Sequence, residues 1–152
     1  MADAALELEY KVEKITESIS RQMESRGVRS TKELMNAKTL VLRGQRSGRR
    51  YRVPNTKTYY TASAPGEPPA QRTGQFRAKW DMKSYSTGSA HSKEVHSEIE
   101  SNVRTEGKKK YLLGQILEEG TPGGKIKPRP YQEKIVDTAK PKIVKIYEEP
   151  YT

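Results

Sequence analysis

The sequence lacks cysteine altogether, and it has only two histidines, one tryptophan and one phenylalanine among 152 residues. Without cysteine the chain has no disulfide framework, no thiolate metal site and no cysteine nucleophile. We therefore expect an intracellular protein or a component of a larger assembly.

Long hydrophobic runs are also missing. No apolar run approaches the roughly 20 residues that a membrane span needs, and the acidic first residues do not resemble a signal peptide. Hydrophobic residues make up only 32% of the chain. This is well below the globular average of roughly 45–50%, a figure that also counts glycine. We expect no membrane partner, a small core with much loop or subunit contact, and one domain with arms.

Residue types that catalyse reactions near neutral pH are scarce. Of the two histidines, His96 falls on the solvent face of an expected strand and His91 in a connecting loop. Glu118 and Glu119 are adjacent at an expected helix end, without the array of oxygen ligands that calcium sites use. The glycine-rich run 120–125 ends in lysine but lacks the spacing of a phosphate-binding loop. We therefore expect no enzyme activity, no metal and no cofactor.

The positive charge is concentrated in the middle third of the chain. Residues 28–79 carry twelve bases and two acids, whereas residues 1–27 have a net charge of −2 and residues 80–152 of +2. Five arginines without an acid fall within residues 43–52, and these are Arg43, Arg46, Arg49, Arg50 and Arg52. Such a segment either faces phosphate or an acidic protein surface, or is a solvated loop that aids solubility. Tyrosines at 51, 59 and 60 fit base stacking or an ordinary hairpin.

Apolar residues predict helices at the start of the chain. Leu8, Val12, Ile15, Ile19 and Met23 recur at spacings of three and four, which predicts a helix over residues 4–26 ended by Gly27. Ser30 and Glu33 have the spacing of a capping box and predict a second helix over 31–42. These apolar stripes pack either in the core or on a neighbouring subunit.

The middle of the chain has the patterns of strands and of one irregular segment. Residues 49–53 and 57–61 predict a short hairpin around Pro54, Asn55 and Thr56. Residues 62–74, which we call the strap, contain three prolines and are expected to be extended and irregular.

Two longer strands and the last helices follow the strap. Alternating residues predict antiparallel strands over 76–86 and 93–103, joined by 87–92, with an exposed loop at 105–110. A short helix is expected at 111–119, a loop at 121–127 and a last helix at 129–148. Pro141 lies inside this helix and is compatible with a kink, with two shorter helices, or with a straight rod.

The predicted fold class is α+β in a single domain over residues 1–152. It has N-terminal helices (1–42), a basic loop, hairpin and Pro-rich strap (43–74), a small antiparallel sheet with a short helix (75–127) and a C-terminal helix (128–148). No repeat of 20–50 residues is present, which excludes a solenoid.

Two sequence runs resemble the tail-completion, or head-tail joining, proteins of the neck of tailed bacteriophages. The first is residues 59–77, which include Ser63, Pro65, Gly66, Pro68, Pro69, Arg72, Thr73 and Gly74. The second includes Glu118, Gly120 and Thr121, followed by Arg129 and Pro130 at the expected start of the last helix. The similarity covers about residues 50–150. The chain departs from the family pattern at Phe76, Leu113, Glu119 and Tyr131.

The resemblance implies a noncatalytic virion protein of α+β fold that forms a homo-oligomeric ring, commonly a hexamer. Such a ring joins the head connector to the tail tube and surrounds the DNA passage. The implied partners are further copies of the chain, a head-completion or connector protein, a tail terminator or tail tube protein, and passing DNA. The implied location is the neck of the virion, after assembly in the host cytoplasm. On this basis Arg43 to Arg52 would line the channel or contact a partner.

A second hypothesis comes from the charge alone. A pI of about 9.7 is typical of a sequence-nonspecific nucleic-acid-binding module, in which residues 43–52 would grip phosphates. Direct duplex binding weakens steeply as salt rises, whereas a ring held by strap and helix contacts persists.

Overall fold

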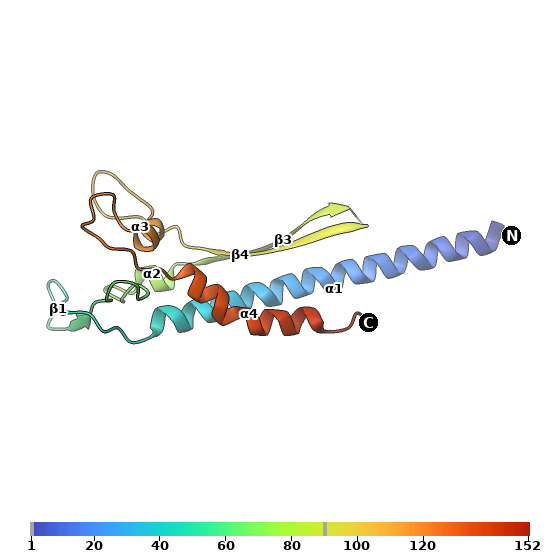
Figure 1. Ribbon diagram of the computed structural model, residues 1–152. Coiled ribbons are helices and arrows are strands. Elements are labelled where there is room, and N and C mark those ends of the chain that lie inside the picture. The colour runs from blue at the N-terminus through green and yellow to red at the C-terminus, as the bar shows by residue number, and fades with distance from the viewer. Residues whose placement is uncertain (1, 90) are drawn as a thin grey trace.

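The computed structural model describes residues 2–89 and 91–152, which form a mixed α+β fold (Figure 1). The fold class predicted from the sequence is therefore confirmed. The elements in chain order are α1 (Ala2–Arg43), β1 (Arg50–Arg52), β2 (Tyr59–Thr61), α2 (Gln75–Ala78), β3 (Asp81–Ser89), β4 (Ser92–Glu100), α3 (Leu113–Glu119) and α4 (Gln132–Glu148). β1 pairs with β2, and β3 pairs with β4, both antiparallel.

Helix α1 is one continuous helix of 42 residues, so the prediction of two helices separated at Gly27 is wrong. Gly27 is buried where α1 meets the β3–β4 hairpin. A Cβ atom there would lie 2.3 Å from Val95 Cγ1 and 2.8 Å from Ser84 Oγ. Gly27 therefore permits close packing and does not end the helix. The expected capping box is also absent, because Ser30 and Glu33 lie in the interior of α1 and not at the start of a helix.

The β3–β4 hairpin runs along α1 (Figure 1). Its register extends from Asp81 opposite Glu100 to Ser89 opposite Ser92. The hydroxyls of Thr31 and Ser97 both donate to the Gly27 carbonyl, at 2.9 and 2.8 Å. The Thr31 bond lies within α1, and the Ser97 bond ties β4 of the hairpin to the helix at the point of closest approach.

The strand boundaries differ from the predicted ones. β4 ends at Glu100, before the predicted end at residue 103. Both strands extend into the predicted connection 87–92, since β3 continues to Ser89 and β4 begins at Ser92. Ala90 lies outside the described residues. β3 begins at Asp81 and not at the predicted residue 76. Phe76 belongs instead to the short helix α2. Phe76 and Trp80 are four residues apart, a spacing that suits one helical turn as well as strand alternation.

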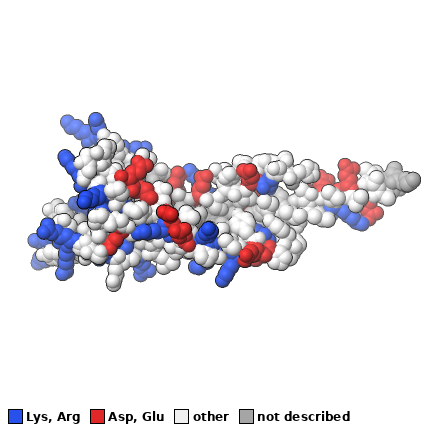
Figure 2. All heavy atoms as spheres, viewed as in Figure 1, with Lys and Arg blue, Asp and Glu red and all other residues white. Residues whose placement is uncertain are grey.

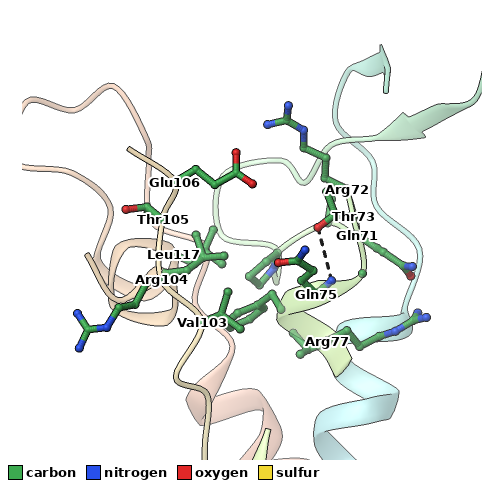
Figure 3. Close-up of a pocket in the computed structure, with 16 residues that line it drawn as sticks. Gln71, Arg72, Thr73, Gln75, Arg77, Val103, Arg104, Thr105, Glu106 and Leu117 are labelled. Carbon is green, nitrogen blue, oxygen red and sulfur yellow. Dashed lines mark hydrogen bonds between the residues drawn. The ribbon is translucent and has the colours of Figure 1, made fainter. Parts of the chain in front are cut away.

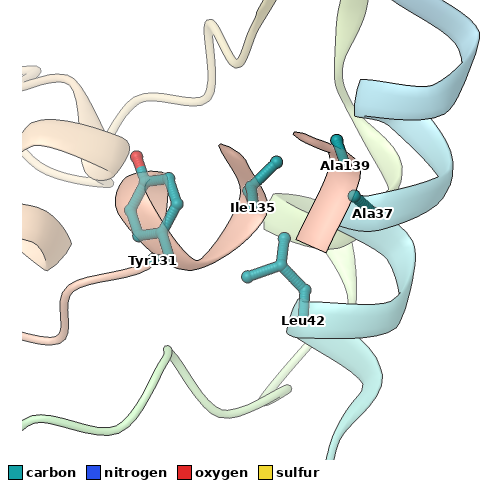
Figure 4. Packing of buried hydrophobic residues seen from close by; sticks show 5 residues of the cluster. All are labelled: Ala37, Leu42, Tyr131, Ile135 and Ala139. Atoms are coloured by element: carbon teal, nitrogen blue, oxygen red, sulfur yellow. The ribbon is translucent and has the colours of Figure 1, made fainter. Parts of the chain in front are cut away.

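Phe76 of α2 and Trp80, which follows the helix, lie in a small core. The rings of Phe76, Trp80 and Tyr131 meet edge to face, with centroids 5.4 to 6.0 Å apart. Beside them lie the buried residues of the core cluster, Ala37, Leu42, Ile135 and Ala139, with Tyr131 itself (Figure 4). The core therefore joins the C-terminal part of α1 to the first turns of α4.

Helix α4 packs against α1. The last helix starts at Gln132 and not at Arg129, and it continues through Pro141 as one helix that changes direction along its length (Figure 1). Of the possibilities left open by the sequence, the kinked single helix is therefore the one observed.

The residues that follow α4 lie against α1. The buried Arg26 donates to the carbonyls of Tyr147, Glu149 and Pro150 at 3.3, 2.5 and 3.2 Å. Gln22 exchanges two hydrogen bonds with the backbone of Thr152. Polar residues of α1 thus hold the C-terminal residues in place.

The N-terminal part of α1 projects beyond the rest of the molecule (Figure 1). Every residue from Ala4 to Ile15 is exposed, including Leu8 at 64% and Ile15 at 59%. Core packing of this stripe, one of the two sequence-based possibilities, is therefore not observed in the single chain. No helix among the described residues combines the length and apolar character needed to cross a membrane.

Candidate functional site

The basic segment, residues 43–52, begins at the last residue of α1 and ends with strand β1. The predicted hairpin is confirmed: Tyr51 pairs with Tyr60, and Asn55 in the turn has a left-handed φ of 62°. Gly48 donates to the Ala62 carbonyl at 2.9 Å. A Cβ at Gly48 would lie 2.4 Å from that oxygen, so only glycine allows the basic segment to approach the strap this closely.

The hairpin places its arginines and tyrosines on two faces. Because side chains alternate along a strand, Arg50 and Arg52 share a face with Tyr59, while Tyr51 and Tyr60 share the other. The Arg50 guanidinium lies over the Tyr59 ring, 5.0 Å from its centroid. The Arg52 Nε donates to the Thr56 carbonyl at 2.7 Å. Both arginines are exposed and supported by contacts within the hairpin.

Arg46 differs from the other arginines of the segment. Its guanidinium donates to the carbonyls of Val41 (2.9 Å), Gly44 (2.7 Å), Gln45 (3.0 Å) and Pro69 (3.1 Å). Burial is the main cause that lowers its pKa from the ordinary arginine value, and nearby Glu67 opposes this. Arg46 therefore joins the end of α1 to the strap. Its donors are engaged within the chain, while its contact with DNA or a partner stays a prediction.

Glu67 fixes the strap to the basic segment. Its carboxylate accepts from the Ser47 hydroxyl, from the Ser47 N–H at 3.1 Å and from the Ala64 N–H at 2.8 Å. These hydrogen bonds, that of the Ser47 hydroxyl foremost, lower the pKa of Glu67 to about 2. Residues 62–74 contain no helix or strand, which confirms the predicted irregular strap.

The remaining arginines lie free on the surface at this end of the molecule. Arg43 and Arg49 are exposed, and in the described part of the chain neither side chain has a hydrogen bond or an ion pair. Figure 2 shows Lys and Arg side chains crowded at the end opposite the N-terminus. The structure therefore brings Arg43, Arg49, Arg50 and Arg52 to one basic end.

A groove of about 440 Å³ opens beside the strap (Figure 3). Its apolar lining comes from α1, α2 and α3 and from the loop after β4, and includes Leu42, Phe76, Val103, Leu113 and Leu117. Arg72, Arg77 and Arg104 stand around it, and Figure 3 shows their guanidinium groups pointing outward on different sides. The Thr73 hydroxyl accepts from the Gln75 N–H at 3.5 Å across the start of α2. We call this feature the arginine-rimmed groove.

The two runs that carry the family resemblance lie against each other. The Phe76 ring of the first run meets the Tyr131 ring of the second edge to face, with centroids 5.4 Å apart. Gly66 of the strap also donates to the Pro128 carbonyl at 3.5 Å and accepts from Lys134 Nζ at 2.8 Å, and these two residues border the second run. Gly74, with a φ of 80°, precedes α2, so the Thr73-Gly74 pair leads into this short helix and not directly into the first long strand.

Residues of the second run build the junction between α3 and α4. Glu118 accepts from the backbone N–H groups of Tyr131 and Gln132, at 2.9 and 3.3 Å. It therefore caps the start of α4. The sequence predicted only that Glu118 lies at the end of a helix, and it did not indicate this capping role. Gly120 has a φ of 79°, and a Cβ there would lie 2.6 Å from the Ile126 carbonyl.

The same junction continues through the loop after α3. The Thr121 hydroxyl accepts from the Ile126 N–H at 3.0 Å, and Arg129 donates its N–H to the Leu117 carbonyl at 2.6 Å. Pro130 directly precedes the buried Tyr131. The motif residues of this run therefore hold the two helices together.

The histidines occupy the places that the sequence suggested. His91 is exposed, and His96 stacks on Tyr85 with ring centroids 4.8 Å apart. His96 Nε2 also lies 3.1 Å from the Thr87 hydroxyl. These contacts place His96 on the surface of the β3–β4 hairpin, away from the arginine-rimmed groove.

The groove and one buried cation beside it were not predicted from the sequence. Lys38 is 6% exposed and donates to the Arg77 carbonyl at 3.0 Å, at the end of α2. Burial lowers the pKa of Lys38, and the nearby Arg77 acts in the same direction. The position of Lys38 between apolar positions of α1 was a signal, but its partner is 39 residues away and has no local pattern.

Comparisons with known proteins give no relative: no family model, no curated protein and no solved structure matches this chain.

Proposed function

We propose that this chain is a structural virion protein of the phage neck, a subunit of a homo-oligomeric ring that joins the head connector to the tail tube and surrounds the DNA passage. The proposal depends on the resemblance of residues 59–77, and of residues 117–121 with 129–131, to tail-completion proteins. The observation that supports it is the contact between these two runs, in which the rings of Phe76 and Tyr131 meet with centroids 5.4 Å apart. Residues that resemble one family in sequence also form one structural unit in this chain.

The distribution of apolar residues supports an assembly subunit. Few hydrophobic residues of the described chain are buried, so its core is small. Leu8, Val12 and Ile15 lie exposed on the projecting part of α1. A chain that leaves such a stripe in solvent has surface to bury against another subunit. The family resemblance makes a hexamer the expected stoichiometry, with a head-completion or connector protein on one side and a tail terminator or tail tube protein on the other.

The basic end supports a place beside DNA. Arg43, Arg49, Arg50 and Arg52 are exposed, and arginines contact phosphate without reading the base sequence. A conduit needs DNA to slide past, so a small number of mobile contacts suits it better than a tight grip.

The proposed location is tested by immunogold labelling of tailed virions released from cells that carry the gene. An antibody raised against the purified chain is expected to label the head–tail junction, and pre-immune serum serves as the control. Labels on the capsid or the tail tip only, or virions without label, would contradict the proposal. Electron microscopy of necks purified from the same virions then gives the ring stoichiometry.

A second candidate function, a sequence-nonspecific nucleic-acid-binding module, is favoured by the same exposed arginines. Replacing Arg43, Arg49 and Arg50 together by Ser leaves the structural Arg46 in place and is expected to keep the fold. If the chain is such a module, the unaltered protein binds duplex DNA in dilute solution, its affinity falls steeply with salt, and the triple variant reduces the slope. A ring subunit instead gives weak binding in dilute solution and altered DNA retention in virions.

A further inference from the structure

The projecting part of α1, residues 4–19, has an apolar face without a cover in the single chain. Leu8, Val12, Ile15 and Ile19 follow one another at spacings of four, three and four residues, so they share one side of the helix. Their exposed fractions are 64, 50, 59 and 36%. We call this surface the α1 stripe.

The α1 stripe continues along the helix into a face that is covered. Gln22 and Arg26 lie three and seven residues beyond Ile19, and both bind the residues that follow α4. The same side of α1 is therefore a packing surface where α4 and the C-terminal residues lie, and is open to solvent over residues 4–19.

The helix segment that carries the α1 stripe has a negative net charge, although Glu7 and Lys11 pair with each other at 2.6 Å. Residues 4–19 contain four glutamates, Glu7, Glu9, Glu13 and Glu17, and two lysines, Lys11 and Lys14, for a net charge of −2. A surface that covers the stripe should therefore combine apolar area with positive charge.

The arginine-rimmed groove has both properties and lies at the opposite end of the molecule (Figures 1 and 2). Its lining includes the five apolar side chains named above, together with three arginines and a single acid, Glu106. A second groove, of about 510 Å³, has apolar residues in its lining as well, but its charged lining residues are all acidic: Glu98, Glu100, Glu118 and Glu119. An acidic helix is attracted to the first groove and repelled by the second.

We propose that residues 4–19 of α1 dock in the arginine-rimmed groove of a second copy of this chain. The i, i+4, i+7 spacing of Leu8, Val12 and Ile15 is that of an amphipathic helix whose anchors enter a groove on a partner. Glu9, which flanks the α1 stripe, is then the acidic residue nearest the arginines at the rim. Two copies of the stripe pairing with each other would instead bring two net negative helices together.

This contact joins different surfaces at opposite ends of each copy. Head-to-tail contacts of this kind form closed rings when the rotation between copies closes, and filaments when it does not. The docking contact itself is independent of the proposed function. That the contact closes into a ring rests on the proposed function, and docking of residues 4–19 would then be the contact that builds the ring.

Disulfide cross-linking tests the contact, since the natural chain has no cysteine to interfere. A Val12→Cys chain is mixed with a differently tagged Gln71→Cys chain and oxidised, over protein concentrations up to the solubility limit. Gln71 lines the groove and is exposed. We expect a disulfide between the two different chains. The matched control is Glu17→Cys, which lies on the opposite side of α1 and should cross-link at least about tenfold less.

Association strength gives a second measurement. Val12→Asp is expected to weaken self-association about 10- to 100-fold, because it removes a buried aliphatic side chain and adds a charge. Reversing Glu9 and Glu13 to Arg should also weaken it, and Arg72→Glu with Arg104→Glu on the other copy should restore it. Circular dichroism checks that each variant keeps the fold.

Each result decides between this contact and its alternatives. A dominant Val12 to Val12 cross-link would show α1 pairing with itself and would overturn the proposal, as would the absence of any Val12 cross-link at every concentration. Rings in the purified necks without the Val12 to Gln71 cross-link would keep the proposed function and refute this contact. The cross-link in a chain that is absent from virions would keep the contact and refute the proposed function.

Discussion

The two halves of α1 share one helix but have opposite surroundings. In residues 20–43, α1 contacts the β3–β4 hairpin, α4 and the C-terminal residues, and Ala37 and Leu42 are buried. In residues 4–15 every side chain is exposed, although the apolar spacing is as regular there. An amphipathic pattern therefore identifies a packing face, but it does not tell whether the partner of that face is in the same chain.

The largest expected difference between the halves is the effect of truncating a leucine. Leu42→Ala should reduce the free energy of unfolding by about 2–5 kcal/mol, because it leaves a cavity in the core. Leu8→Ala is its matched control on the same helix and should change the free energy by less than about 0.5 kcal/mol. Chemical denaturation followed by circular dichroism measures both. Equal losses would mean that residues 4–19 are packed within the single chain.

A second difference concerns the close contact between the β3–β4 hairpin and Gly27 in the covered half of α1. Gly27→Ala should destabilise the protein by about 1–3 kcal/mol through overpacking against Val95, although alanine is the better helix former. Val95→Ala in the same chain should recover most of this loss. If Gly27→Ala raises the melting temperature, the close contact at Gly27 is not the reason for the glycine.

A third difference is expected within the covered half, between the buried Arg26 and the exposed Arg21. Arg26→Met should cost about 2–3 kcal/mol, because the C-terminal carbonyls lose a charged donor. Arg21→Met, at an exposed position of the same helix, should be close to neutral. Hydrogen exchange at residues 147–152 should rise in the first variant only. An equal rise in both variants would contradict the role given to Arg26.

The smallest effect is expected from pH at the strap, next to the covered end of α1. Since the pKa of Glu67 is lowered to about 2, its contribution to stability is complete above the ordinary value of about 4.5 and is lost as the pH falls toward 2. Hydrogen exchange at residues 62–69 should therefore speed up over this interval beyond its intrinsic pH dependence. Glu67→Gln should show faster exchange at neutral pH and no such additional change. A titration of Glu67 near its ordinary pKa would refute the hydrogen-bonded carboxylate.

Local patterns were sufficient for several elements. The turn at Pro54 and Asn55, the prolines of the strap and the apolar spacing of α4 act over a few residues, and the corresponding hairpin, irregular segment and helix were predicted. The continuity of α1 was not, because Gly27 is explained by Val95 and Ser84, which are distant in the sequence. Phe76 was assigned to a strand because its spacing from Trp80 fits both periods.

The candidate site was predicted in part, for a similar reason. The exposure of Arg43, Arg49, Arg50 and Arg52 agrees with the charged surface segment that the sequence predicted. The inward role of Arg46 depends on the Pro69 carbonyl, 23 residues away, and no local pattern distinguishes it from its neighbours. The arginine-rimmed groove combines residues from four separate segments, so only the fold reveals it.

Hydrogen exchange at residues 4–19 tests most directly whether the uncovered half of α1 is an assembly surface. The amides of these residues are measured in the dilute chain and in necks purified from virions, with residues 30–40 as the internal reference. We predict fast exchange in the dilute chain and at least about tenfold slower exchange in the neck, because docking buries the α1 stripe and suppresses local opening. The same fast exchange of residues 4–19 in both samples would contradict the account.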